Sequence, residues 1–89
     1  MNDYYIEDNE NSLTIKYEWH GSDRPYSIPK WELGRTRGRE SEWLMQLLYK
    51  PWASRAMLYD VAQYIIRYNP DNDIDWESTY AIVNSHFRD

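Results

Sequence analysis

Residues 13–19, Leu-Thr-Ile-Lys-Tyr-Glu-Trp, alternate apolar and polar side chains without a break. Successive side chains of a strand point to opposite faces, so this period of two predicts a β-strand with one buried face. Residues 4–6, Tyr-Tyr-Ile, form a second strand-forming run upstream, and turn-forming residues at 8–11 separate the two runs. We therefore expect a β-hairpin at the start of the chain.

A short third strand is expected after this hairpin. Residues 20–25, His-Gly-Ser-Asp-Arg-Pro, are typical of a turn, and residues 26–28, Tyr-Ser-Ile, favour a strand. Pro29 would end it, because proline has no amide hydrogen for a strand ladder. The N-terminal part is therefore predicted as a hairpin or a three-strand meander over about residues 3–28.

Three helices are predicted after a flexible basic loop at residues 30–39, at about residues 41–49, 52–68 and 74–87. Ser41 is suited to cap the first helix, and Pro51 and Pro70 stop the first two. Two apolar stripes at helical spacing support the second and third helices: Met57, Leu58, Val61, Ala62, Ile65 and Tyr68 in the second, and Trp76, Tyr80, Val83 and Phe87 in the third.

Neither the sheet nor the helices can bury an apolar side alone. The predicted fold class is therefore α+β, with the three helices packed on one face of the small antiparallel sheet. A chain of 89 residues has room for one core, so residues 1–89 are expected to form a single domain.

Several classes of protein are disfavoured by the composition. The chain has no Cys, which removes disulfides and thiolate metal sites, and no apolar run near the roughly 20 residues that cross a bilayer. Its acidic start does not resemble a signal peptide. We expect a cytoplasmic protein that does not contact membranes, acting in the host cytoplasm if it is encoded by a phage.

The net charge of −5 is unevenly distributed along the chain. Residues 1–23 carry six acids and one base, residues 24–67 eight bases and four acids, and residues 68–89 five acids and one base. This layout either neutralises itself in the fold or leaves two faces of opposite sign, and the sequence does not choose between them.

A row of alternating acids precedes and enters the third predicted helix: Asp71, Asp73, Asp75 and Glu77. A calcium-binding EF-hand loop counted from Asp71 would need Gly at its sixth position and Glu at its twelfth, where this chain has Trp76 and Ile82. We therefore expect no metal site, and interpret the row as carboxylates that favour a helix N-terminus. Together with Asp3, Glu7, Asp8 and Glu10, the row could also form a negative surface for a basic partner.

No catalytic constellation is recognisable. His20 and His86 belong to no ligand pair, and the sequence has neither a nucleophile elbow nor a phosphate-binding glycine pattern. We predict a protein without enzymatic activity and without a cofactor.

The basic loop is the best argument for nucleic acid. Arg35, Arg37 and Arg39 could contact phosphates while Trp31 stacks on a base. A nucleic-acid binder is expected to be basic, however, and this chain is acidic. Direct contact with nucleic acid through this loop is therefore the alternative and not the leading hypothesis.

The aromatic residues are nearly all of the kinds found at protein interfaces, with five Trp and nine Tyr against one Phe. Those on apolar stripes are expected in the core. Tyr26, Trp31 and Trp52 lie off the stripes or in loops and are candidates for contact with a partner, or for a seam between two copies of the chain.

The leading hypothesis is a small acidic module that binds a larger protein, in particular one with a basic, nucleic-acid-binding surface. It would inhibit that protein by covering the surface and by replacing phosphate with carboxylate. In size, acidity and Trp/Tyr content the chain is similar to the short proteins that phages use against host defences, such as anti-CRISPR and anti-restriction proteins, and to toxin immunity proteins. No motif supports membership of any one family.

Overall fold

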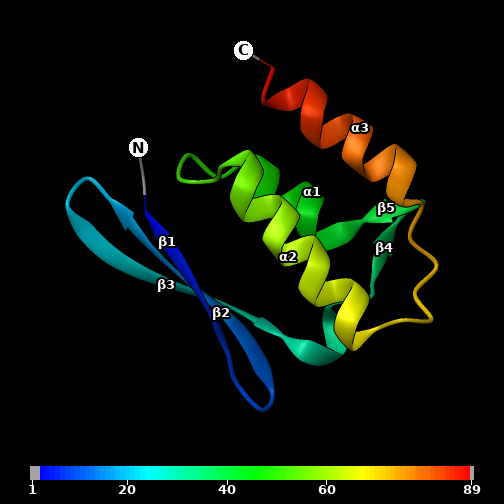
Figure 1. Cartoon of the computed structure of the whole chain (residues 1–89), viewed down its shortest axis with the longest axis horizontal. Coiled ribbons are helices and arrows are strands. Elements are labelled where there is room, and N and C mark those ends of the chain that lie inside the picture. The colour runs from blue at the N-terminus through cyan, green and yellow to red at the C-terminus, as the bar shows by residue number, and fades with distance from the viewer. Residues whose placement is uncertain (1–2, 89) are drawn as a thin grey trace. The chain divides into compact units, whose positions relative to one another are not determined.

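The computed structural model describes residues 3–88 and divides the chain into two compact units. We call residues 1–32 the sheet unit and residues 33–89 the helical unit, and describe each by itself (Figure 1). The predicted α+β class is confirmed, because a three-strand antiparallel sheet is followed by a two-strand sheet and three α-helices. That residues 1–89 form one domain, and that the helices cover one face of the sheet, stay predictions.

The sheet unit is the predicted three-strand meander. Its strands β1 (Tyr4–Asp8), β2 (Ser12–Trp19) and β3 (Ser22–Pro29) pair antiparallel in the order β1-β2-β3, and a short 3-10 helix, η1 (Lys30–Glu32), follows. The alternation in β2 gives the sheet one apolar face, on which Leu13, Ile15 and Tyr17 are buried. Ile28, the partner of Leu13 in the register, is buried on the same face.

The second turn is shorter than predicted, and the third strand is longer. His20 and Gly21 alone make the turn, with φ of 53° and 80°, and Trp19 pairs with Ser22 directly across it. A two-residue hairpin turn with both residues at positive φ matches the right-handed twist of its strands, which explains why a strand can begin at once after it.

Pro25 lies inside β3, contrary to the prediction that residues 20–25 form a turn, whereas Pro29 is the last residue of the strand, as predicted. Antiparallel partners alternate between pairs that exchange hydrogen bonds and pairs that do not. Counted from the bonded pair that closes the turn, Pro25 and Pro29 fall in the second kind of pair, where their nitrogens face away from β2. Proline is tolerated there because β3 is an edge strand of this sheet.

The helical unit begins with a small hairpin where a flexible loop was predicted. Strands β4 (Thr36–Arg37) and β5 (Glu40–Ser41) pair antiparallel around Gly38, whose φ of 68° suits glycine in a tight turn. The three helices are α1 (Glu42–Leu48), α2 (Arg55–Tyr68) and α3 (Trp76–His86). The side chains of Ser41, Ser54 and Asp75 cap their N-termini, each by accepting a hydrogen bond from a backbone amide in the first turn.

Helix α3 is less buried along its aromatic stripe than predicted. Val83 is buried, whereas Trp76, Tyr80 and Phe87 are half-buried. Tyr80 packs edge-on against Tyr59 of α2, with the ring centroids 5.2 Å apart. Tyrosine and tryptophan suit half-buried positions because one end of each side chain can remain in water.

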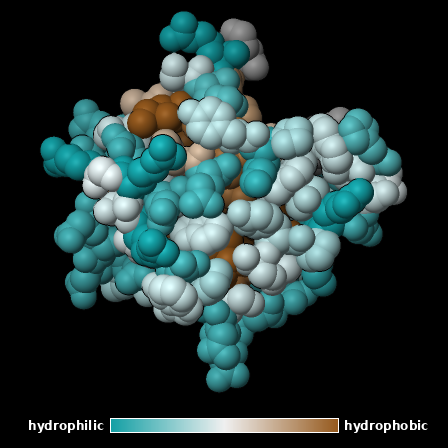
Figure 2. Space-filling model, turned by 180° about the vertical axis from the view of Figure 1, so that it is seen from behind, coloured by the Kyte–Doolittle hydropathy of each residue, from teal (hydrophilic) through white to brown (hydrophobic). Residues whose placement is uncertain are grey.

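The described helices include none with the length and apolar character needed to cross a membrane. Figure 2 shows one face of the molecule, on which hydrophilic and intermediate side chains predominate and strongly hydrophobic ones occupy small areas. On this face, any partner would meet individual aromatic and charged residues and not a broad aliphatic patch.

Candidate protein-binding face

The negative charge of the chain belongs mainly to the sheet unit. Residues 1–32 contain seven acids and three bases, a balance of −4, whereas residues 33–89 contain eight acids and seven bases, a balance of −1. The basic middle of the sequence therefore lies largely in the same unit as the acidic C-terminal segment. Within the helical unit, the charges of the basic middle segment and of the acidic C-terminal segment nearly cancel.

One ion pair joins these two segments directly. Arg39 Nη2 lies 3.8 Å from Asp75 Oδ2, and the amide of Asp75 donates to the carbonyl of Arg39 at 2.7 Å. Ser78 Oγ donates to Glu40 Oε1 at 3.1 Å beside them. The β4–β5 hairpin and the start of α3 thus form one polar junction within the helical unit.

The predicted acidic row separates into a structural residue and three exposed ones. Asp75 is the N-cap of α3, where its Oδ1 accepts from the amide of Ser78 at 3.1 Å. Asp71, Asp73 and Glu77 are exposed. Among residues 3–88, no group of three acidic or imidazole side chains has the geometry to hold a metal ion.

The three arginines of the predicted nucleic-acid contact are all exposed on or beside the β4–β5 hairpin. Besides the pair made by Arg39, Arg35 Nε lies 3.3 Å from Glu42 Oε2. Arg37 pairs with Glu40 in the strand register. Acidic side chains therefore accompany this basic hairpin, which lowers the positive potential that it offers to phosphate.

The N-terminal acids belong to the sheet unit, whereas the row before α3 belongs to the helical unit. Glu7 pairs with Lys16 at 2.8 Å, Asp8 pairs with Lys30 at 2.6 Å, and Glu10 is exposed in the first turn. The structure thus gives Glu7 and Asp8 partners within the sheet unit itself.

The three candidate aromatic anchors differ in burial. Trp31, in η1, is 77% exposed, and Tyr26 is half-buried. Trp52 is only 6% exposed, so its selection as a surface anchor from its position off the apolar stripes was wrong. It follows Pro51 outside any helical stripe, and the sequence pattern therefore gave no sign of its burial.

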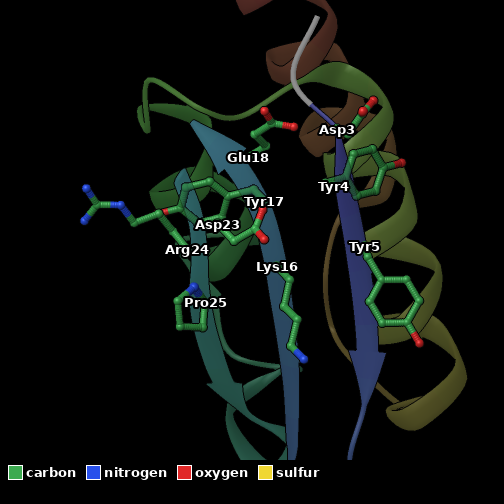
Figure 3. A pocket seen from close by; sticks show the side chains of 9 residues that line it. All are labelled: Asp3, Tyr4, Tyr5, Lys16, Tyr17, Glu18, Asp23, Arg24 and Pro25. Atoms are coloured by element: carbon green, nitrogen blue, oxygen red, sulfur yellow. The ribbon is translucent and has the colours of Figure 1, made fainter. Parts of the chain in front are cut away.

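The polar face of the three-strand sheet carries a hollow formed by residues of the sheet unit. Direct partners in a register lie on the same face, which places two rows side by side there. The acidic row of the sheet consists of Asp3, Glu18 and Asp23, and the tyrosine row consists of Tyr5, Lys16 and Pro25. A shallow hollow of about 520 Å³ opens over these rows (Figure 3). It is also lined by Tyr4, Tyr17 and Arg24, the cross-strand row between the two, whose positions alternate to the apolar face of the sheet.

The cationic side chains around this hollow point away from its acidic ones. Lys16 pairs with Glu7, and this contact lowers the pKa of the Glu7 carboxyl and raises the pKa of the Lys16 amine. In Figure 3 the Lys16 amine turns away from Glu18, and the Arg24 guanidinium points away from Glu18 and Asp23. The carboxylates of Glu18 and Asp23 make no ion pair within residues 3–88 at the distances that define the pairs above.

A chain of hydroxyl and amide groups continues the polar face toward the first turn. Asn9 Nδ2 donates to Thr14 Oγ1 at 3.1 Å, and Thr14 Oγ1 lies 2.9 Å from Ser27 Oγ on β3. The first bond joins the turn to β2 and the second joins β2 to β3, so together they support the register of the face beside the two rows.

Most residues of this face were not selected from the sequence. Asp3 and Glu7 were considered for a negative surface, whereas Tyr5, Glu18 and Asp23 were not. Asp23 was assigned to a turn. The alternation in residues 13–19 did contain a usable signal, since its polar positions, Lys16 and Glu18, must share the solvent face of the strand.

Comparison of the chain with family models, curated proteins and solved structures gives no match.

Proposed function

We propose that this protein is a small acidic module that binds a larger protein through the polar face of its three-strand sheet. The observation that carries the proposal is the coincidence, in the sheet unit, of most of the net negative charge with a hollow that holds an exposed tyrosine beside carboxylates that make no ion pair within residues 3–88. Aromatic residues surrounded by charge are typical of protein interfaces.

The partner surface that this face fits is basic. Carboxylates attract Arg and Lys over several ångströms, steer the encounter, and disfavour partners of like charge. A protein that binds nucleic acid presents such a surface to phosphate, so an acidic module bound there would exclude the nucleic acid both sterically and electrostatically. The proposed action is therefore inhibition by occlusion, the mode expected of a phage antagonist of host defence or of a toxin immunity protein.

A capture experiment with matched variants tests this proposal. The tagged wild-type chain, Glu18→Gln/Asp23→Asn, and Asp71→Asn/Asp73→Asn are incubated with an extract of the source cell or its host, and retained proteins are quantified by mass spectrometry. Each variant removes two exposed negative charges, one pair from the sheet unit and one from the helical unit. We expect a protein that is retained by the wild type and the second variant and is lost from the first.

The competing hypothesis is direct nucleic-acid binding through Arg35, Arg37 and Arg39, which are all exposed. Their acidic neighbours disfavour it. A mobility-shift titration at low salt decides the matter: binding that falls steeply with salt and disappears when the three arginines become alanine would replace the protein-binding proposal.

A further inference from the structure

We infer that the hollow on the sheet takes an arginine side chain of the partner, with the guanidinium seated between Tyr5 and the acidic row formed by Asp3, Glu18 and Asp23. This inference rests on the proposed function and adds the chemistry of the group that is recognised.

The floor of the hollow is aromatic and aliphatic. The ring of Tyr5 is part of a side chain that is 63% exposed, and the tyrosine row continues through the methylene chain of Lys16 to the pyrrolidine ring of Pro25. The Lys16 amine is held by Glu7 at 2.8 Å and is directed away from the acidic row. A cation can therefore approach the face of the Tyr5 ring, where the quadrupole of the ring attracts positive charge.

The acidic row supplies the negative end of the hollow. Glu18 and Asp23 are direct partners in the β2–β3 register, and the amide of Glu18 donates to the carbonyl of Asp3 at 2.9 Å. Like charges directly opposite each other destabilise a sheet, and strands lie about 4.8 Å apart, so these carboxylates repel one another in the free protein. A cation bound across the row relieves that repulsion, which favours the bound state over and above the new contacts.

The combination of a flat ring and adjacent carboxylates favours arginine over lysine. A guanidinium is planar, stacks on aromatic rings and offers several donors in a fixed fork to carboxylate oxygens. A lysine amine is a compact, strongly hydrated charge that can satisfy the carboxylates and gains less from the ring. The hollow should therefore discriminate between two peptides of equal charge.

The test uses two peptide probes, nine residues of arginine and nine residues of lysine, titrated into the isotope-labelled full chain at fixed salt and followed by amide NMR shifts. We expect the arginine peptide to shift amides of β1, β2 and β3 and to bind at least about fivefold more tightly than the lysine peptide. Tyr5→Leu should weaken the arginine peptide about tenfold, and Tyr5→Phe, which keeps the ring, should restore most of its affinity.

Charge-matched variants separate a site from general attraction. Glu18→Gln/Asp23→Asn should weaken the arginine peptide about tenfold, and Asp71→Asn/Asp73→Asn by less than about twofold. Equal affinity for the two peptides, or equal loss in the two double variants, would overturn the inference. Unchanged amide shifts for the free variants outside the substituted positions verify that each still folds.

The failure of this inference differs from the failure of the proposed function. If a captured partner depends on Glu18 and Asp23 but is not displaced by the arginine peptide, the sheet face is the interface and the arginine site is refuted. If the captured partner is insensitive to both residues, the proposed function itself is refuted, whatever the peptides do.

Discussion

Replacing Asp75 tests whether the acidic row before α3 serves the fold, as its geometry indicates. Asp75 accepts a hydrogen bond from the amide of Ser78 and lies 3.8 Å from Arg39. Losing an N-cap side chain costs about 1 kcal/mol, within a range of about 0.5–2 kcal/mol. The ion pair adds little, about 0.5 kcal/mol at most, because the Arg39 side chain is 82% exposed and screened by solvent.

We therefore expect Asp75→Ala to lower the free energy of unfolding by about 1.5 kcal/mol, and Asp75→Asn, which keeps an acceptor for the cap, by about 0.5 kcal/mol. Asp73→Ala, at an exposed position of the same row, should change it by less than about 0.5 kcal/mol. Urea unfolding followed by helical circular dichroism measures all three. Equal losses for Asp75→Ala and Asp73→Ala, or for the Ala and Asn variants of Asp75, would refute this division of the row.

Two further predictions concern aromatic residues. Trp52→Ala should destabilise the protein by about 3–5 kcal/mol and Trp31→Ala by less than about 0.5 kcal/mol, because the first side chain is 6% exposed and the second 77%; similar losses in urea unfolding would contradict the assigned burial. Burial raises the pKa of the Tyr80 hydroxyl above its ordinary 10.0, with a smaller contribution from the nearby Tyr59. The folded state thus holds this proton more tightly than the unfolded chain, so the contribution of Tyr80 to stability should be constant below pH about 10 and be lost as the pH rises through the higher folded value. Tyr80→Phe should reduce the resulting fall of stability in urea unfolding at alkaline pH, and an unchanged fall would assign it to other groups.

The parts of the fold that were predicted correctly are those with a strong local period. The alternation in residues 13–19 located β2 within a meander, and the helical spacing of the apolar residues between Met57 and Ile65 located α2, whose Met57, Val61 and Ile65 are buried. A period reports which face of an element is buried, and it does so from neighbouring residues alone.

The features that were mispredicted depend on conformation or on distant residues. A histidine at positive φ made a turn of two residues where six were assigned, and the position of Pro25 in an edge strand was visible only once the register was known. The burial of Trp52 likewise depends on tertiary packing.

The candidate site also depends on contacts between distant residues, which the sequence alone does not reveal. Its residues come from three strands and from Asp3, which precedes the first, and Asp3, Glu18 and Asp23 become neighbours only through the register of two hairpins. Composition could indicate that an acidic, Tyr- and Trp-rich chain binds a protein, but not which acids remain unpaired. The ion pair between Arg39 and Asp75, which neutralises segments 36 residues apart, was equally hidden.

The most direct test of the sheet face as the binding surface is the affinity of the captured partner for three forms of the chain, measured by titration calorimetry at one ionic strength. We predict that Glu18→Gln/Asp23→Asn raises Kd at least about tenfold, or 1.4 kcal/mol, whereas Asp71→Asn/Asp73→Asn raises it by less than about twofold. The reverse order, or equal changes in the two variants, would contradict the assignment of binding to the sheet.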